Sequence, residues 1–429
     1  MGDSEEFVSN LLFISLLITG QQANFTMPKI IGLDVGQGYA VACVLDRFPL
    51  NIQQHFKQLQ KNRQFIKLKS DRSGVEQLLS LQPDAIVLEP SGFWYSAFWA
   101  RVANIHHVEV CWIGHADLSH TRGSYGFTNK RDDEDSLCLA ATYFDERFIN
   151  VHGRKRYLQH YRSSEIEQLR SLFLGKEQLS KIRSGMVAQI KQRLSYEFPE
   201  MASKTFNISS VQGFTPFLGW LAGVSSNSRY DRLYSNSITQ SLDISISDYT
   251  REHALALMRL EKRITIALLE LEHILNFPEF VKYCEVFDRF GFGLSNKVLL
   301  LLHVYPFEKF LINGKPWVDY ELSISDKLVK RHRSLRSFQA FLGLSYSIAQ
   351  SGDRTTRAFH GSTMMRSHLY AWAVCQICPK NYKVNTEIGR ALSDHYQQLR
   401  KSNKGKDSII RILFKATRML FYELNKVIT

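Results

Sequence analysis

Residues 29–45, KIIGLDVGQGYAVACVL, contain two apolar runs on either side of a Gly-Gln-Gly turn. Short apolar runs that flank a glycine-rich turn are typical of a β-hairpin. Asp34 lies near the middle of the first run, where a carboxylate among apolar residues costs free energy unless a partner neutralises it. The segment therefore predicts a sheet whose first strand carries a carboxylate with a specific role.

The order of strand-like and helix-like segments between residues 29 and 150 restricts the fold further. Three strand-like segments come first, and a helix, a strand, a helix, a strand and a closing helix follow. This order predicts an α/β domain of the ribonuclease H type over residues 28–150. In that layout the fourth strand lies beside the first, so Glu89, at the end of DAIVLEP, would lie near Asp34.

The closing helix contains an acidic run, NKRDDEDSLCLAATYF. Its apolar residues recur at helical intervals, and residues three apart share one face of a helix. Asp132 and Asp135 would therefore point the same way. Asp133 and Glu134 belong to the same run and are expected to face the solvent.

Four carboxylates brought together in this way repel one another, and such a set persists when a divalent metal neutralises it. Carboxylate oxygens suit Mg²⁺, with Mn²⁺ as a substitute. Two ions held about 4 Å apart can activate the attacking oxygen and stabilise the leaving oxygen in phosphodiester cleavage. The residues predict a metal-dependent nuclease site made of Asp34, Glu89, Asp132 and Asp135.

The charge balance indicates a polyanionic partner. The chain of 429 residues has 54 Lys and Arg against 41 Asp and Glu, which gives a net charge of +13. Basic proteins favour nucleic acid because binding releases condensed counterions. A basic protein with no such partner is the alternative. The length exceeds the usual size of one domain, so two or three domains are expected.

Six cysteines are scattered along the chain, several of them inside apolar segments. A reduced, cytoplasmic protein fits this pattern best. Cys375 and Cys378 form a C-x-x-C sequence within AWAVCQICP, but no second pair follows. We interpret the pair as part of a buried helix rather than as a zinc site.

The N-terminal segment contains LLFISLLITG, which resembles the apolar part of a signal peptide. The residues before it are acidic, and the run is too short to span a bilayer, so no membrane partner is expected. Met27 directly precedes PKIIGLDVG. Residues 1–26 are interpreted as an upstream extension from a mis-chosen start codon, with an amphipathic arm as the alternative.

The rest of the chain is predicted to be mostly helical. Residues 155–280 contain two long apolar stripes, which suit a coiled-coil hairpin or two helices of an ordinary bundle. They are separated by a loop-rich insertion at 202–248. Residues 281–429 form a helical, basic C-terminal domain, in which a Gly-Phe-Gly turn leads into an apolar helix and residues 312–333 resemble a second insertion. The expected fold class is thus α/β plus all-α.

A polar loop between two apolar helices is expected around Ser351 and Gly352. A serine hydroxyl in a glycine-containing loop near arginines can attack a phosphodiester while the guanidinium groups stabilise the developing charge. An ordinary loop serine is the alternative, and Ser345 and Ser347 are competing candidates. The residues considered for nucleic-acid binding are Arg354, Arg357, Arg366, Lys404 and Lys406.

Several motifs in one order carry a family resemblance. GLDVG, LEPSG, NKRDDED, the helical hairpin, FGFG and FQAFLGLSYSIAQSG followed by HGSTMMRSHLY resemble the DEDD transposases of the IS-one-ten family, which includes the Piv-type site-specific invertases. The likeness covers most of residues 28–429 apart from the two insertions. The chain departs from the family pattern at Arg131 and Ser136, where Thr and Ala are common, and at Phe359 and His360, where a lysine usually precedes the glycine.

The resemblance implies an N-terminal RuvC-like domain that binds magnesium through Asp34, Glu89, Asp132 and Asp135. It also implies a coiled coil that assembles a dimer or tetramer, and a C-terminal domain with a Ser-Gly motif, which matches Ser351 and Gly352. In the family this serine is thought to attack DNA and form a phosphoserine intermediate. One branch is directed to its DNA by a structured guide RNA, so RNA becomes a candidate partner.

We therefore expect a magnesium-dependent DNA transposase or site-specific recombinase, acting at the nucleoid in a bacterial cytoplasm. Two functions from other classes are retained. A structure-selective nuclease such as a junction resolvase would use the carboxylates and water without Ser351. A nucleic-acid-binding protein descended from a transposase would catalyse nothing, and the intact acidic set argues against it.

Overall fold

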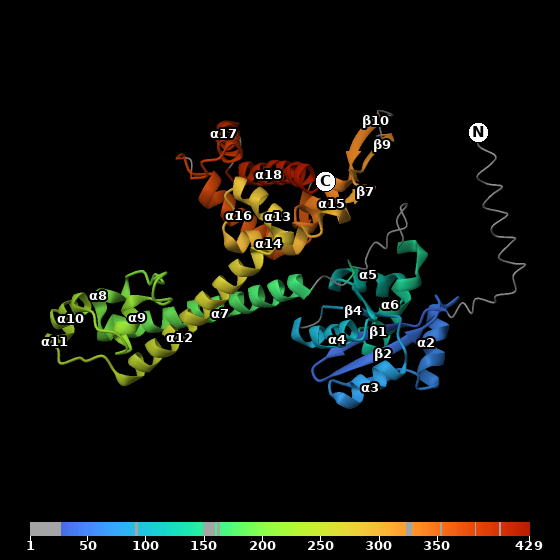
Figure 1. Cartoon of the computed structure of the whole chain (residues 1–429), viewed down its shortest axis with the longest axis horizontal. Helices are drawn as coiled ribbons and strands as arrows, with labels where there is room; N and C mark the ends of the chain where they lie inside the picture. Colours follow the sequence, from blue (N-terminus) through green and yellow to red (C-terminus); the bar gives the residue numbers. More distant parts are fainter. Residues whose placement is uncertain are drawn as a thin grey trace, which may run out of the picture. The chain divides into compact units, whose positions relative to one another are not determined.

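The computed structural model describes residues 27–90, 93–148, 159–160, 164–322, 328–351, 354–381, 383–402 and 405–429. The chain forms two compact units, Met1–Arg162 and Ser163–Thr429. The first unit contains the predicted α/β domain, and the second contains both predicted helical regions (Figure 1). The predicted N-terminal extension, residues 1–26, lies outside the described residues.

A mixed sheet in the order β3-β2-β1-β4-β5-β6 forms the centre of the first unit. β1 pairs antiparallel with β2 and parallel with β4, so the fourth strand lies beside the first, as the sequence pattern predicted. The strands are β1 (Ile30–Gly36), β2 (Tyr39–Leu45), β3 (Ile66–Lys69), β4 (Ala85–Leu88), β5 (Glu109–Trp112) and β6 (Gln159–His160).

Helices cover both faces of this sheet. One apolar core joins the sheet to α2, α5 and α6, and includes Ile30 and Val87. A second core joins the opposite face to α3 and α4, and includes Leu33 and Leu88. The helices are α2 (Ile52–Lys61), α3 (Arg72–Ser80), α4 (Phe93–Ile105), α5 (His115–Ser124) and α6 (Asp132–Phe144).

Two of these helices differ from the sequence prediction. α2 lies between β2 and β3, where three consecutive strands were expected, and α5 precedes α6, where no helix was expected. α2 is strongly amphipathic but short, and Asn51 caps it by accepting a hydrogen bond from the Gln54 amide. α5 has no side-chain cap, and its sequence HADLSHTRGS has few apolar residues, so neither helix signal was strong.

α6 lies unusually close to β1 because position 32 is a glycine. A Cβ atom added to Gly32 would lie 2.0 Å from the carbonyl oxygen of Ser136 and 2.5 Å from the amide nitrogen of Ala140. The backbone of the helix therefore rests directly on the strand. The buried apolar face of α6, which includes Leu137 and Ala141, fills the same core.

Two long antiparallel helices, α7 (Ser164–Glu197) and α12 (Asp248–Leu275), run side by side in the second unit (Figure 1). The start of α7 and the end of α12 share one apolar core, and the end of α7 and the start of α12 share another. Arg183 on α7 forms an ion pair of 2.7 Å with Glu261 on α12, whose side chain is fully buried. This pairing bears out the predicted helical hairpin.

The insertion at 202–248 contains short helices in addition to loops. They pack aromatic residues such as Phe217 and Trp220 against the ends of α7 and α12 in a core of their own. Because each helix has only four to eight residues, no sustained helical period marks it in the sequence. The elements are α8 (Pro199–Ala202), α9 (Pro216–Leu221), α10 (Ser228–Ser235) and α11 (Ile238–Ser241).

The remaining helices share a large apolar core with the α7–α12 pair. They are α13 (Pro278–Arg289), α14 (Leu294–Val304), η2 (Phe307–Phe310), α15 (Arg333–Phe341), α16 (Thr363–Trp372), the π-helix η3 (Ala373–Ile377), α17 (Glu387–Ser402) and α18 (Gly405–Ile428). Gly293 precedes α14 as its N-cap, where the Gly-Phe-Gly turn was predicted to lead into an apolar helix.

The described residues of the second unit also form three β-hairpins, so the prediction of a purely helical C-terminal domain was incomplete. Their strands are β7 (Leu311–Ile312) with β8 (Lys315–Pro316), β9 (Val318–Leu322) with β10 (Leu328–His332), and β11 (Ser345–Ser351) with β12 (Arg354–His360). The last hairpin corrects the prediction of a polar loop around Ser351. Alternation of β-branched or aromatic residues with polar ones, as in SYSIAQS, favours a strand over a loop.

The C-x-x-C pair is less buried than predicted: Cys375 is exposed and Cys378 is half-buried at the end of the π-helix. The three cysteines within the sheet and α6 are buried, as expected of small apolar residues. Among the described helices, none combines the length and the apolar character that crossing a bilayer requires.

The contact at Gly32 can be tested by substitution. We expect Gly32→Ala to destabilise the first unit by about 1–3 kcal/mol or more, because the added methyl group meets backbone atoms that cannot rotate away. Hydrogen exchange followed by mass spectrometry should show faster exchange of β1 and α6 amides.

Gly123→Ala is the matched control, since nothing lies within 4 Å of the position its methyl group would take on α5. This change should leave exchange unaltered or stabilise the unit by about 0.4–1 kcal/mol. Equal exchange rates in Gly32→Ala and the native protein would show that the helix is not held at this distance.

Candidate functional site

Asp34 and Glu89 lie side by side on the face of the sheet that α6 covers. Side chains two apart on a strand share a face, so Ile30, Gly32 and Asp34 face α6. On β4 the same alternation directs Val87 and the following Glu89 to that face. The parallel register pairs residue 33 with residue 88, so the two carboxylates are the next residues along neighbouring strands.

The first turn of α6 adds Asp132 and Asp135. The exposed N-terminal amides of a helix favour negative charge, which stabilises carboxylates at this end. Asp135 is 1% exposed, whereas Asp132 is exposed and accepts a hydrogen bond of 3.1 Å from the Tyr39 hydroxyl. Because Gly32 contacts the helix one turn further on, this first turn is directed toward Asp34.

The charges of the other three predicted carboxylates act on Asp34. The pKa of Asp34 is raised from its usual value near 3.8 to about 7. Burial is the largest cause, and the charges of Asp135, Asp132 and Glu89 follow in that order. Lys130 opposes the effect. Asp135, Asp132 and Glu89 therefore lie near enough to Asp34 for their charges to act on its carboxyl group.

Two side chains of α5, Arg122 and His115, contact the cluster. Arg122 donates a hydrogen bond of 2.5 Å from Nη1 to Oδ1 of Asp135, and its side chain is 16% exposed. His115 Nδ1 contacts Oε1 of Glu89. Burial raises the pKa of Asp135, and the Arg122 guanidinium opposes that rise. The sequence interpretation missed both residues because it did not place a helix there. A run with two His and one Arg directly before the acidic segment was the available signal.

Glu134 corrects a prediction, since it is buried rather than solvent-facing. Its Oε2 atom accepts no hydrogen bond from any described residue. Burial raises the pKa of Glu134, while the charges of Arg131 and Arg122 lower it. The acidic run therefore places two adjacent buried carboxylates, Glu134 and Asp135, near the same arginine.

The donor set fits a hard divalent cation. Four carboxylates supply the oxygen ligands that Mg²⁺ and Mn²⁺ prefer, and their mutual repulsion at Asp34 would be relieved by positive charge. As the side chains lie, no group of three or more His, Cys, Asp or Glu residues in the described part of the chain is arranged to hold a metal ion. Three of the four carboxylates are engaged instead by Arg122, His115 and Tyr39.

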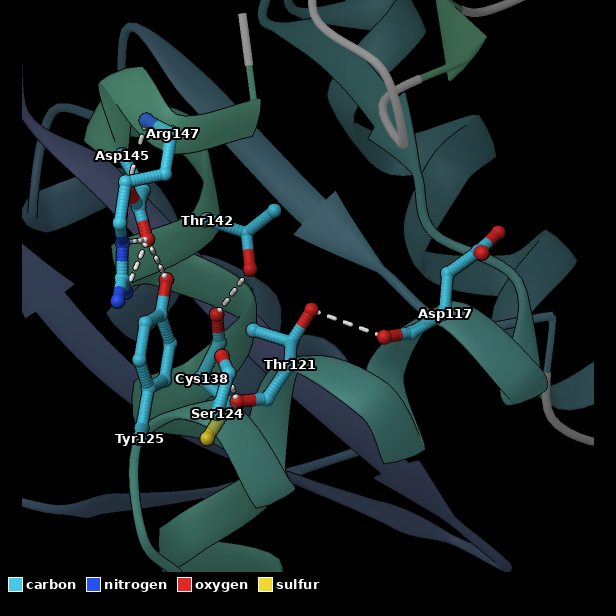
Figure 2. A network of polar contacts seen from close by, with 8 residues as sticks. All are labelled: Asp117, Thr121, Ser124, Tyr125, Cys138, Thr142, Asp145 and Arg147. Carbon is cyan, nitrogen blue, oxygen red and sulfur yellow. Dashed lines mark hydrogen bonds and ion pairs between the residues drawn. The ribbon is translucent and has the colours of Figure 1, made fainter. Parts of the chain in front are cut away.

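A second polar network fixes α5 against α6 (Figure 2). The Tyr125 hydroxyl, just after α5, donates a hydrogen bond of 2.9 Å to Asp145, just after α6. Arg147 forms an ion pair of 2.7 Å with the same carboxylate, whose side chain is 3% exposed. Within each helix, Thr121 and Thr142 donate hydrogen bonds to the carbonyl groups of Asp117 and Cys138. This network lies at the opposite end of α6 from the acidic run.

The predicted nucleophile and most of the predicted basic residues lie in or near the β11–β12 hairpin and at the start of α18. Ser351 is the last residue of β11 and pairs in register with Arg354. The side chains of Ser351, Arg354 and Arg357 lie outside the described part of the structure, as do Gly352 and Lys404. Lys406 is exposed in the first turn of α18.

The guanidinium of Arg366 contacts neighbouring elements of the protein. Its Nη1 donates a hydrogen bond of 2.7 Å to the carbonyl oxygen of Gly343, and the guanidinium lies 5.3 Å from the centre of the Phe359 ring. These contacts connect α16 to the loop before β11 and to β12. The guanidinium therefore stabilises the base of the hairpin that carries Ser351.

No protein-family model matches the chain, and no curated protein is significantly similar to it.

The raised pKa of Asp34 has a consequence for stability. In the metal-free protein, folded Asp34 keeps its proton up to about pH 7, whereas in the unfolded chain it loses the proton near pH 3.8. The folded state binds more protons in this interval. The contribution of Asp34 to the free energy of unfolding therefore falls as pH rises from about 4 to 7, by at most about 1.4 kcal/mol per pH unit. Urea unfolding in EDTA should measure this slope.

Asp34→Asn removes the titrating group and keeps the shape of the side chain. We expect the variant to be more stable than the native protein at pH 7, with the difference shrinking toward pH 4. Parallel stability curves for the two proteins across this range would contradict the assignment.

Proposed function

We propose that this chain is a magnesium-dependent enzyme that cleaves and rejoins DNA strands, a transposase or site-specific recombinase. The observation that carries the proposal is the gathering of Asp34, Glu89, Asp132 and Asp135 on the face of the sheet that α6 covers, where the charges of the other three raise the pKa of Asp34. The strand order and the covering helices are consistent with a ribonuclease H-like, RuvC-like domain. A net charge of +13 favours DNA or a guide RNA as partner.

The four carboxylates would hold Mg²⁺, with Mn²⁺ as a substitute. The bound ions would supply Lewis-acid stabilisation of the charge that develops on phosphate oxygens. Asp34 and Glu89, on neighbouring strands, would form the rigid part of the site, and Asp132 and Asp135 would complete it from α6. Lys130, exposed beside them, is placed to attract the phosphate backbone.

Ser351 is the proposed nucleophile. Its hydroxyl would attack a phosphodiester, forming an ester bond between Ser351 and the phosphate and releasing the sugar hydroxyl as leaving group. Its place as the last residue of β11, paired in register with Arg354, is compatible with reaching a strand of DNA. The paired long helices α7 and α12 would serve assembly into a dimer or tetramer.

A structure-selective nuclease is the second candidate. All four carboxylates belong to the first unit, whereas Ser351 belongs to the second. The carboxylate site could therefore act on water alone, and a variant without the serine hydroxyl distinguishes the two functions.

The first activity test concerns the carboxylates. We expect Asp34→Asn or Asp135→Asn to lower magnesium-dependent cleavage by about 100-fold or more, because the site loses a ligand charge. A suitable substrate is a plasmid that carries the gene with its flanking DNA, and cleavage can be followed on gels. Asp46→Asn, at an exposed carboxylate paired with Arg47, is the control and should retain activity. Full activity in both site variants would rule out the proposed metal site.

The second activity test concerns the serine. Ser351→Ala should abolish the covalent protein–DNA adduct, seen as labelled DNA that migrates with the protein on a denaturing gel, together with strand exchange. Ser345→Ala and Ser347→Ala, on the same strand, should retain both. Loss of the adduct with retained magnesium-dependent cleavage would favour the nuclease, and a retained adduct would show that another residue is the nucleophile.

A further inference from the structure

Arg122 is placed as a cation inside the acidic cluster. Its guanidinium binds Asp135 at 2.5 Å, where the carboxylate is 1% exposed and the arginine side chain 16% exposed. Two opposite charges this far from water interact strongly, and removing either one leaves a buried charge without compensation. The pair therefore stabilises the helix carboxylate in the conformation seen here.

The same guanidinium influences a second buried carboxylate. Burial raises the pKa of Glu134, and the positive charge of Arg122 is one of two that oppose this rise. The Oε2 atom of Glu134 is buried and accepts no hydrogen bond from the described residues. Glu134 and Asp135 are adjacent on α6. One arginine thus offsets part of the negative charge of both.

The position of Arg122 is fixed by the helices rather than by a flexible loop. It lies on α5 three residues before Tyr125, whose hydroxyl holds the end of α6 through Asp145 (Figure 2). Leu118 on the same helix is buried in the core shared with α6. Removing the contact between Arg122 and Asp135 therefore requires the arginine side chain to move and leaves both helices in place.

We propose that Arg122 is a built-in counter-ion that substitutes for the divalent metal when the site is empty and competes with the metal for Asp135. This inference rests on the metal site proposed above. Two cations that share one carboxylate repel each other, and the hydrogen bond from Nη1 draws on the same Oδ1 electron density that a metal ion would coordinate. Metal binding at Asp135 therefore works against the charge of the guanidinium, which weakens the apparent affinity.

Arg122 is thus a positioning residue with opposite effects on two measurable properties. It stabilises the metal-free fold and weakens metal binding. An arginine with only a structural role would affect the first property and leave the second unchanged. Arg147 provides that comparison, because it pairs with the buried carboxylate of Asp145 outside the acidic cluster.

The experiment compares the full-length native protein with Arg122→Gln, Arg122→Lys, Arg147→Gln and Asp34→Asn. Mn²⁺ affinity is measured by titration calorimetry or from the electron paramagnetic resonance signal of free Mn²⁺, and thermal unfolding is recorded in EDTA and in saturating Mn²⁺. We expect Arg122→Gln to unfold at a lower temperature in EDTA and to bind Mn²⁺ on the order of tenfold more tightly. Arg122→Lys keeps the charge and should lie between it and the native protein.

Mn²⁺ should return the unfolding temperature of Arg122→Gln toward that of the metal-bound native protein, because the metal replaces the missing cation. Arg147→Gln should also unfold earlier in EDTA, but with native Mn²⁺ affinity and no such recovery. If Arg122→Gln does not fold in EDTA, folding on addition of Mn²⁺ is the expected result. Failure of Mn²⁺ to restore it would overturn the inference.

The outcomes separate this inference from the proposed function. Native binding of Mn²⁺ that Asp34→Asn abolishes, combined with unchanged or weaker binding by Arg122→Gln, would overturn the inference and leave the metal site standing. No Asp34-dependent binding by either the native protein or Arg122→Gln would overturn both. Binding by Arg122→Gln where the native protein shows little would support the competition directly.

Discussion

The close contact between α6 and β1 at Gly32 is the constraint on which the acidic cluster depends. The helix backbone rests on the strand with no side chain between them, and this brings the first turn of α6 next to Asp34. A bulkier residue at position 32 would move the helix outward and separate Asp132 and Asp135 from the strand carboxylates. Packing geometry and site geometry are thus determined by the same contact.

That contact imposes an electrostatic cost, and the fold offsets it with cations and donors from other elements. Asp135 and Glu134 are buried on α6, and Asp34 lies among three like charges. Arg122 and His115 come from α5, and the Tyr39 hydroxyl comes from β2. Tyr125 and Asp145 join α5 to α6. The Arg122 guanidinium is therefore held on a helix that is fixed to α6, the helix whose buried carboxylates it neutralises.

The sequence predicted the parts of the site that follow from strand order and helical spacing. The expected strand order places Glu89 near Asp34, and a spacing of three places Asp132 and Asp135 on one face of a helix, so all four could be named before the fold was known. The partners of these carboxylates were missed because α5 has a weak helix signal. Burial of Glu134 was missed because helical period alone does not show how deeply the first turn of α6 sits against α5. Ser351 was placed in a loop because its turn residues were given more weight than the alternation before them.

The engagement of three carboxylates by protein groups explains why the quartet does not converge on one point as the side chains lie. Each of these carboxylates contacts a different group, and a divalent ion would compete with those contacts for the same side chains. The free energy of metal binding is then the difference between coordination and the lost ion pair and hydrogen bonds. A metal site built in this way would stay folded without metal and would bind it less tightly than the carboxylates alone, so its occupancy would respond to the concentration of the ion.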